Sequence, residues 1–262
     1  MKNAISSHLP GDFPWQVHWF ETIDSTNTQA KRMAQEGAPH GTVLIAGHQT
    51  VGRGRMGRSF VSPAGSGLYL SVILRPNCPA QSLMHLTCAA GVAACDAVQQ
   101  SCGIRPGIKW INDLVIENRK LGGILAELSV DAKNGLVEYA IIGIGINCLQ
   151  GTADFPPELQ SIAISLKAAG YRADITRLAA CLICKLYEMS LQLTNPEAVM
   201  AVYRRDCITL GREVLVLRGK EKQHATALDV DAEGALVVRL QDGSIKSVNS
   251  GEVSVRGMYG YI

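Results

Sequence analysis

A glycine- and arginine-rich segment, residues 52–58, limits the folds open to this chain more than any other stretch. Three glycines and three arginines fill six of its seven positions, and the glycines have the spacing G-x-G-x-x-G. In a dinucleotide-binding fold this motif opens a helix, and an acidic residue follows about 20 positions later. Here the segment lies between two predicted strands, residues 42–46 and 68–74, and no acidic residue occurs between Glu36 and Asp96. The context argues against that fold, and the chain also lacks the Gly-Lys-Ser/Thr of a P-loop.

The same segment predicts a binding site for a bulky anion. Guanidinium groups are permanently charged and bind phosphate or carboxylate through paired hydrogen bonds, and glycines let the backbone approach a ligand closely. Arg53, Arg55 and Arg58 alternate with the glycines, and Arg75 follows within the same stretch without acidic residues. A region that gathers positive charge without counter-ions favours an anion.

Length and composition describe an ordinary soluble protein with one large domain, or with one large and one small domain. The chain has 262 residues, of which 47% are hydrophobic and 18% are charged, and its net charge of +2 does not suggest nucleic acid as a partner. Residues 1–15 lack a signal-peptide core and no apolar run could span a bilayer, so we expect a cytoplasmic protein without a membrane partner. Its eight cysteines are then expected to be free, buried thiols.

The order of predicted elements indicates an α+β region followed by a small all-β region, after an irregular start over residues 1–16. The expected strands are residues 17–23, 42–46, 68–74, 108–110, 114–116, 121–128 and 137–146, and the expected helices are residues 25–36, 82–100, 162–169, 175–193 and 196–205. Five further strands are expected at residues 213–218, 223–230, 235–240, 245–249 and 252–255, with the first turn between them at 219–220. We predict a mixed-sheet domain with flanking helices over residues 1–208 and a small β-barrel over residues 209–262.

A predicted hairpin, residues 108–128, carries several charged side chains. Lys109 and Asp113 come before its turn, Arg119 and Lys120 come after it, and a Gly-Gly pair follows. A lysine ammonium can stabilise a pentavalent phosphate or a leaving group. Asp113 could orient an amine, accept its proton or help to hold a metal, and the sequence leaves these roles open. A lysine in a turn is more commonly only solvated, so neither residue alone establishes a site.

A third cluster interrupts the most apolar predicted strand, residues 137–146. Gly143 and Gly145 lie inside this strand and Asn147 follows it. Glycines within a strand indicate that a flat or bulky group lies against the backbone, or that a helix packs closely on the sheet. An asparagine amide can pair with the edge of a purine. The pattern alone leaves both interpretations open.

Taken together, these clusters resemble the biotin–protein ligases. The resemblance rests on five motifs that occur in the family's order: residues 25–27 (Ser-Thr-Asn), 52–58, 109–113, 119–125 and 143–147. It implies a catalytic domain of the class II synthetase or lipoate-ligase type. The predicted C-terminal barrel resembles the SH3-like domain that follows the catalytic domain in this family.

The resemblance implies ATP-dependent biotinylation through biotinyl-AMP, with biotin and ATP as substrates and Mg²⁺ on the phosphates. The acceptor would be a lysine of a biotin carboxyl carrier protein, a subunit of acetyl-CoA carboxylase. The expected catalytic residues are Arg55, Lys109, Asp113 and Lys120. Biotin contacts are expected from Ser25, Thr26, Asn27, Gln49, Arg53, Gly54, Arg55, Lys120, Gly123 and Leu125. Contacts to ATP or the adenylate are expected from Arg55, Arg58, Phe60, Asn112, Gly143, Gly145 and Asn147, and no metal ligand is assigned.

The resemblance also implies a role for each charged residue. Lys120 would bridge the biotin carboxylate and the phosphate with Lys109 assisting, and Asp113 would orient the acceptor amine. Arg58 would face the leaving pyrophosphate. Residues 52–58 would close over the mixed anhydride, which hydrolyses readily, and would exclude water from it.

The chain departs from the family pattern at Ile111, Gly122 and Phe60, and Phe60 would lie against adenine together with Asn147. Only about 20 residues precede the first family motif of the predicted catalytic domain, which predicts the monofunctional type without a DNA-binding domain and without DNA as a partner. Members of the family often form homodimers. A lipoate–protein ligase is the main alternative, and a non-catalytic module that senses biotin or a nucleotide is another. A DNA-binding repressor would need a basic recognition helix, which the sequence does not show.

Overall fold

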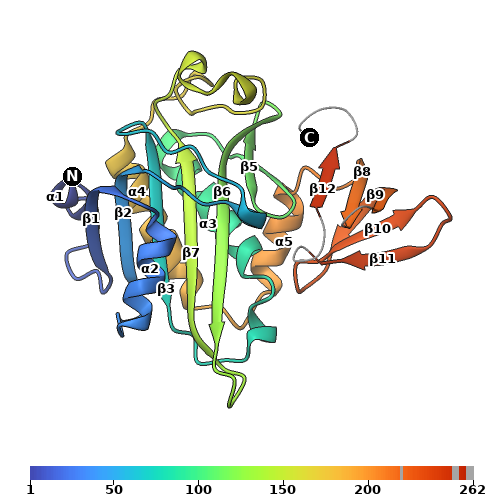
Figure 1. Ribbon diagram of the computed structural model, residues 1–262, viewed down its shortest axis with the longest axis horizontal. Helices are drawn as coiled ribbons and strands as arrows, with labels where there is room; N and C mark the ends of the chain where they lie inside the picture. Colours follow the sequence, from blue (N-terminus) through green and yellow to red (C-terminus); the bar gives the residue numbers. More distant parts are fainter. Residues whose placement is uncertain (219–220, 250–253, 258–262) are drawn as a thin grey trace.

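A computed structural model describes residues 1–218, 221–249 and 254–257, the last four as backbone. Within these residues the chain forms two β-sheets, one of seven strands and one of five (Figure 1). The larger sheet has the strand order β1-β2-β3-β7-β6-β5-β4, and the smaller has the order β11-β10-β9-β8-β12. No helix among the described residues is long and apolar enough to span a membrane.

The seven-stranded sheet is mixed, as predicted. Its strands are β1 Gln16–Ile23, β2 Thr42–Gln49, β3 Gly67–Leu74, β4 Gly107–Lys109, β5 Asp113–Ile116, β6 Arg119–Val130 and β7 Val137–Asn147. β1 and β2 are parallel, and all other neighbouring pairs are antiparallel. The turn between β5 and β6 consists of Glu117 and Asn118, which have φ values of 50° and 60°. A two-residue turn with two positive φ values has a twist that matches the twist of the two strands it joins.

Helices cover both faces of this sheet. They are α1 Lys2–Ser6, α2 Thr26–Gln35, α3 Leu86–Cys102, α4 Ile175–Ser190 and α5 Glu197–Asp206, with 3₁₀ helices η1 Arg55–Gly57, η2 Ala80–Leu83, η3 Thr152–Asp154 and η4 Pro157–Leu159. In Figure 1, α2 lies in front of the sheet and α3 and α4 lie behind it. Two predictions are corrected: residues 1–16 are not wholly irregular because they contain α1, and the helix predicted from residue 82 begins at Leu86.

The helix predicted at residues 162–169 does not form. Instead, this segment pairs with the start of β6, where the amide of Lys120 donates to the Ile162 carbonyl at 2.7 Å and the amide of Ile164 donates to the Lys120 carbonyl at 2.9 Å. Every buried backbone group needs a partner. The first residues of β6 extend past the end of β7 and supply these partners, so residues 162–164 lie against the strand and a turn over residues 166–170 follows.

Side chains alternate between the two faces of the larger sheet, as strand geometry requires. The back-facing core, which packs against α3 and α4, includes Val43, Ile45, Leu70, Val72, Ile142 and Ile144. The front-facing core under α2 consists of Ala30, Ala34, Leu44, Ile73, Tyr139 and Ile141. Further along the same front face, β6 and β7 present Gly123, Gly143 and Gly145 in place of large side chains. At the end where α2 begins, the front face therefore leaves room over its backbone for side chains from other segments.

The smaller sheet is antiparallel and SH3-like, as predicted. Its strands are β8 Glu213–Arg218, β9 Glu221–Val230, β10 Leu236–Leu240, β11 Ile245–Val248 and β12 Ser254–Gly257. The predicted turn at residues 219–220 and the first two residues of the strand predicted at 252–255 lie outside the described residues. This sheet contacts the larger unit through Trp110, whose indole Nε1 donates to the Gly234 carbonyl at 3.0 Å.

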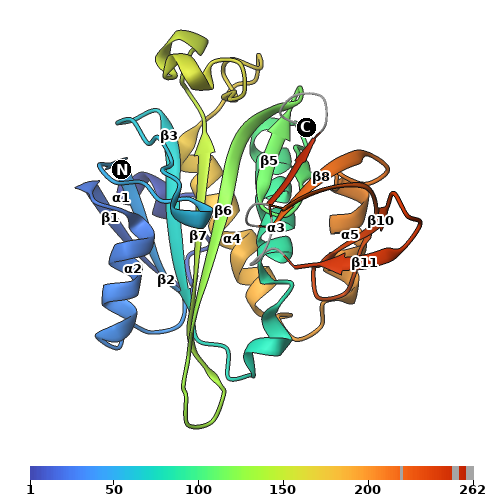
Figure 2. The same cartoon turned by 45° about the vertical axis from the view of Figure 1, so that its right-hand side comes forward.

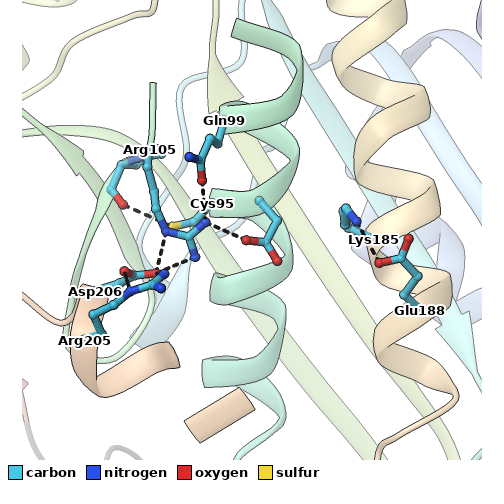
Figure 3. A network of polar contacts seen from close by, with 9 residues as sticks. Cys95, Gln99, Arg105, Lys185, Glu188, Arg205 and Asp206 are labelled. Carbon is cyan, nitrogen blue, oxygen red and sulfur yellow. Dashed lines mark hydrogen bonds and ion pairs between the residues drawn. The ribbon is translucent and has the colours of Figure 1, made fainter. Parts of the chain in front are cut away.

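Arg105, in the loop after α3, fastens α5 to α3 (Figure 3). Its guanidinium donates to Asp96 of α3 and to Asp206 of α5, each at 2.5 Å. The Asp206 side chain is only 7% exposed, so the pair is largely shielded from solvent. α5 in turn supports the loop between β4 and β5, because Tyr203 donates its hydroxyl to the Ile111 carbonyl at 3.1 Å.

Candidate active site

Strand register brings together clusters that are far apart in the sequence. Across the front of the larger sheet, Lys109 lies opposite Asp113, Asp113 opposite Gly123, and Gly123 opposite Gly145. The row continues to Tyr69 of β3. Two of the three predicted clusters therefore share one row on the front face of the sheet.

Lys120 lies over Gly123 and pairs with Asp113. Its ammonium Nζ is 2.5 Å from Asp113 Oδ1, and the two side chains are 30% and 19% exposed. A β-bulge between Leu114 and Val115 shifts the register of β5 and β6 here. A Cβ on Gly123 would lie 3.4 Å from Lys120 Nζ, so the glycine leaves space for this lysine. The arrangement offers a cation and a carboxylate, partly shielded from water, at one point of the sheet.

Arg55 approaches the same point from the glycine- and arginine-rich segment. Its Nη1 donates to Asn112 Oδ1 at 2.9 Å, and Asn112 is fixed by its own Nδ2 donating to the Ile124 carbonyl at 2.9 Å. Burial lowers the pKa of Arg55, the carboxylate of Asp113 raises it and the neighbouring Arg58 lowers it. The guanidinium remains charged at neutral pH, because an arginine pKa starts above 12.

A buried polar network marks the N-terminal end of α2. The Thr26 amide donates to Gln49 Oε1 at 2.8 Å, and Gln49 Nε2 donates to Ser62 Oγ at 2.9 Å. Ser71 Oγ lies 2.7 Å from both Thr26 Oγ1 and Asn27 Oδ1. The predicted biotin residues Ser25, Thr26 and Asn27 are at most 4% exposed. Polar groups held in fixed positions in a buried place suit a small ligand that has several hydrogen-bonding atoms.

The glycines of β7 provide room for two of the predicted residues. A Cβ on Gly143 would overlap Asn27 Oδ1, and a Cβ on Gly145 would lie 2.6 Å from the ring of Phe60. Phe60 also makes an edge contact with Tyr69, with ring centroids 6.4 Å apart. Both interpretations of a glycine in this strand therefore apply: at Gly143 the helix α2 packs closely on the sheet, and at Gly145 a flat group, the ring of Phe60, lies against the backbone.

That segment, residues 50–62, is called the lid segment below. It crosses the front of the sheet in Figure 1 and Figure 2. Hydrogen bonds from the Phe60 amide to the Gly52 carbonyl (2.9 Å) and from the Gly54 amide to the Arg58 carbonyl (2.7 Å) fold it into a narrow loop. Met56 and Gly57 have φ values of 54° and 73°, which allow its tight reversal.

Two strand residues of the polar network have no counterpart among the sequence predictions. Ser71 lies in the otherwise apolar β3, and Glu127 lies on β6 two residues after the predicted Leu125. Glu127 Oε2 accepts a hydrogen bond from Asn27 Nδ2 at 2.9 Å, and Arg53 Nη2 pairs with Glu127 Oε1 at 3.1 Å. The only sequence signal for either is a polar residue at a strand position whose side chain lies on the front face. Identifying such a position requires the strand pairing to be known.

Asn147 lies at the end of β7, and its amide contacts the segment after that strand. Its Nδ2 donates to the Ile164 carbonyl at 3.2 Å, and Gln150 Nε2 lies 3.5 Å from its Oδ1. The residue is 5% exposed. Among the described residues, no group of three or more His, Cys, Asp or Glu side chains could hold a metal ion.

Comparison with known proteins agrees with this geometry. Residues 19–147 match the Biotin/lipoate A/B protein ligase family, and residues 209–256 match the Biotin protein ligase C terminal domain. The biotin--[acetyl-CoA-carboxylase] ligase of Mycobacterium tuberculosis is 35% identical over 237 residues, which are 87% of this chain and 85% of that protein. The bifunctional ligase/repressor BirA of Bacillus subtilis is 34% identical over 242 residues, 90% of this chain and 73% of that protein.

Among solved structures, the biotin protein ligase from Aquifex aeolicus in complex with biotin and ATP has a TM-score of 0.77 and 27% identity, and covers 94% of this chain and 100% of that chain. The fold and the charged, glycine-lined front face thus define an enzyme of the biotin and lipoate ligase class. The additional match of residues 209–256 to the C-terminal domain of biotin protein ligases narrows this class to one family. The chain belongs to the biotin protein ligase family and catalyses ATP-dependent biotinylation.

Proposed function

We propose that the front-face site makes biotinyl-AMP and then passes biotin to a lysine of a biotin carboxyl carrier protein of acetyl-CoA carboxylase. A biotin carboxylate oxygen attacks the α-phosphorus of ATP, and the bond to pyrophosphate breaks. The lysine ε-amine then attacks the acyl carbon, loses a proton and displaces AMP. The observation that carries this proposal is the meeting of Arg55, Lys120 and Asp113 on the same face of the sheet as the polar network at the start of α2.

Electrostatics explains why this meeting point suits the first step. A carboxylate and a triphosphate repel each other, so catalysis must supply positive charge where they join. Lys120 bridges the carboxylate and the α-phosphate in our proposal, Arg55 holds the phosphate, and Arg58 faces the pyrophosphate. Lys109, whose backbone lies opposite Asp113, adds a further positive charge.

Asp113 fits the second step. Its pairing with Lys120 keeps a carboxylate beside the reacting acyl group, where it can orient the incoming amine. Mg²⁺ enters as part of the ATP substrate, because the described residues offer no cage of metal ligands and Mg²⁺ is commonly held largely by phosphates.

The substrates occupy two neighbouring parts of the front face. In our proposal, biotin lies against Gly54, Gly123 and Leu125, with its ring toward the network of Thr26 and Gln49. Adenine lies beyond Gly143 and Gly145. The adenylate also contacts Phe60, Asn112 and Asn147 in this assignment, and Asn147 then exchanges its hydrogen bond with Ile164 for one with the base.

We also propose that residues 1–208 form the catalytic domain and residues 209–262 the C-terminal domain. The segment before β8 supports this boundary, because α5 ends at Asp206 and the strands of the smaller sheet begin at Glu213. The contact between Trp110 and Gly234 holds the small sheet against the loop that carries Asn112.

The test combines the protein with ATP, Mg²⁺, biotin and a carboxyl carrier domain, and reads the product by intact mass. We expect the carrier to gain one biotin, on one lysine, together with release of pyrophosphate. A parallel reaction with lipoate tests the alternative substrate. Modification with lipoate alone would overturn our choice of substrate, and no pyrophosphate with ATP and biotin would make the protein a sensing module.

A further inference from the structure

Glu127 connects two parts of the site that come from distant stretches of the chain. Its carboxylate accepts from Asn27 of α2 at 2.9 Å and receives both terminal nitrogens of Arg53, with Nη2 at 3.1 Å from Oε1 and Nη1 at 3.3 Å from Oε2. A two-pronged arginine–carboxylate pair fixes orientation as well as distance. The side chain of Glu127 is 27% exposed, so this contact is partly shielded from solvent.

The lid segment is held at several points across the front face. Arg53 contacts Glu127 of β6, Arg55 contacts Asn112 before β5, and Phe60 packs over Gly145 of β7. The first two contacts join opposite ends of the site. Glu127 lies four residues along β6 from the residue opposite Asp113, a separation of about 13 Å at the rise of a strand.

Two arginines that are two positions apart in the lid segment therefore have different surroundings. Arg55 reaches the charged cluster where the phosphate is expected, and its pKa is influenced by Asp113. The charge of Arg53 is already matched by Glu127, at the far end of the site. An arginine that is paired with a carboxylate is poorly suited to bind phosphate and well suited to anchor a loop.

We propose that Glu127 is a positioning residue that holds the lid segment closed over the adenylate, through Arg53, and at the same time fixes the Asn27 amide in the biotin pocket. Glu127 touches no reacting atom in this assignment, which rests on the function proposed above. A closed lid segment keeps water from the mixed anhydride. Loss of the Glu127 charge should therefore shorten the lifetime of bound biotinyl-AMP more than it slows the formation of that intermediate.

The test compares Glu127→Gln with Glu138→Gln. Glutamine keeps the shape and an acceptor oxygen but removes the charge. Glu138 is an exposed residue on the neighbouring β7 and accepts from Ser129 at 2.7 Å, so it is a matched control away from the lid segment. Two rates are measured without carrier protein: the single-turnover formation of biotinyl-AMP, and the steady release of pyrophosphate, which continues only as fast as the adenylate escapes or hydrolyses.

We expect Glu127→Gln to raise the steady release about fivefold, the upper range for a partly exposed ion pair, with a formation rate at saturating biotin within about twofold of the unmodified protein. Glu138→Gln should change neither rate. Arg53→Gln should raise the release to the same degree, and the double variant should release no faster than either single variant. A merely structural role would instead lower the melting temperature and slow the formation of biotinyl-AMP as much as it speeds its release.

The outcomes separate the two proposals. If the unmodified protein forms no biotinyl-AMP, the proposed function fails, and the role of Glu127 fails with it. If the unmodified protein forms and retains the adenylate while Glu127→Gln retains it equally well, only the role of Glu127 is overturned. Should Glu127→Gln fold poorly, Arg53→Gln decides the question, because it leaves β6 unchanged; retention by that variant would overturn the inference.

Discussion

The two faces of the seven-stranded sheet are built from the same strands, but the back face forms the core and the front face carries the site. On β7, Ile142, Ile144 and Ile146 point to the back and are at most 2% exposed, whereas Gly143 and Gly145 alternate with them and point to the front. The back face fills its space with large aliphatic side chains. The front face gives its space to Asn27, Phe60 and, in our proposal, the substrates.

This difference follows from the two-residue period of a strand. Adjacent residues share a backbone but not an environment, so stability and binding can be assigned to alternate positions without conflict. The front face is free to carry charges and glycines because the back face supplies most of the buried apolar surface. Substitutions on the two faces should therefore affect different measurements.

The largest expected effect is on the front face, with Lys120→Ala. Loss of the ammonium removes positive charge from the junction of carboxylate and phosphate, so the single-turnover rate of biotinyl-AMP formation should fall at least about 100-fold. ATP affinity and melting temperature should change little. Lys133→Ala, in the exposed turn between β6 and β7, is the control. A full rate in Lys120→Ala would contradict the electrostatic argument.

The next largest effect, with Asp206→Asn behind the sheet, is expected on the stability of the fold and not on the reaction rate. This change removes the more deeply buried of the two carboxylates that pair with Arg105 and should lower the free energy of unfolding by about 1.5–3 kcal/mol at pH 7, as measured by urea denaturation. Because α5 only supports the loop before Asn112, the rate of adenylate formation at a temperature where the protein stays folded should change less than in Lys120→Ala.

The same pair predicts a pH dependence of stability. Burial opposes ionisation of Asp206, but hydrogen bonds from Arg105 and Arg205 outweigh it and lower the pKa of this carboxyl. The stabilisation is therefore complete above the usual aspartate pKa of about 3.9 and is lost as the pH falls through the lower folded value. The unmodified protein should lose more unfolding free energy below pH 4 than Asp206→Asn does. Equal losses would show that this pair contributes no pH-dependent stability.

Gly143→Ala tests the front face with a change of one methyl group. The backbone of Gly143 does not need a positive φ, so alanine is compatible with the strand, but its Cβ would overlap Asn27 Oδ1. Displacement of Asn27 should weaken biotin binding about tenfold, measured by calorimetry. Unchanged affinity would mean that the Asn27 amide does not define the pocket.

The parts of the site that can be recognised in the sequence are motifs in which charged residues lie close to glycines. The structure brings three of these charged residues, Lys109, Asp113 and Lys120, to neighbouring positions of the sheet. Ser71 and Glu127 escape such prediction because each is a single polar residue whose direction depends on strand register. Register depends on contacts between residues far apart in the chain, such as the 100 positions that separate Asn27 from Glu127. Periodicity within one segment cannot reveal them.

The predicted helix at residues 162–169 fails for a related reason. Its small and apolar residues fit a helical period, yet a short helix in isolation is only marginally stable. The backbone of Lys120, more than 40 positions earlier, offers hydrogen bonds to Ile162 and Ile164 and decides the conformation. Tertiary pairing therefore decides the conformation of this segment, where local preference is weak.

The smallest expected effect, with Ile142→Val, completes the comparison with Gly143. Ile142 is fully buried on the back face, so removal of one methylene should lower the free energy of unfolding by about 0.5–1.5 kcal/mol, measured by urea denaturation. Biotin affinity and the rate of adenylate formation should match the unmodified protein, although the residue adjoins Gly143. If Ile142→Val weakened biotin binding as much as Gly143→Ala does, the two faces would be mechanically coupled, because a cavity behind the sheet would then shift the backbone on which Asn27 rests. Unchanged binding means that β7 is stiff enough to isolate the pocket from its own core.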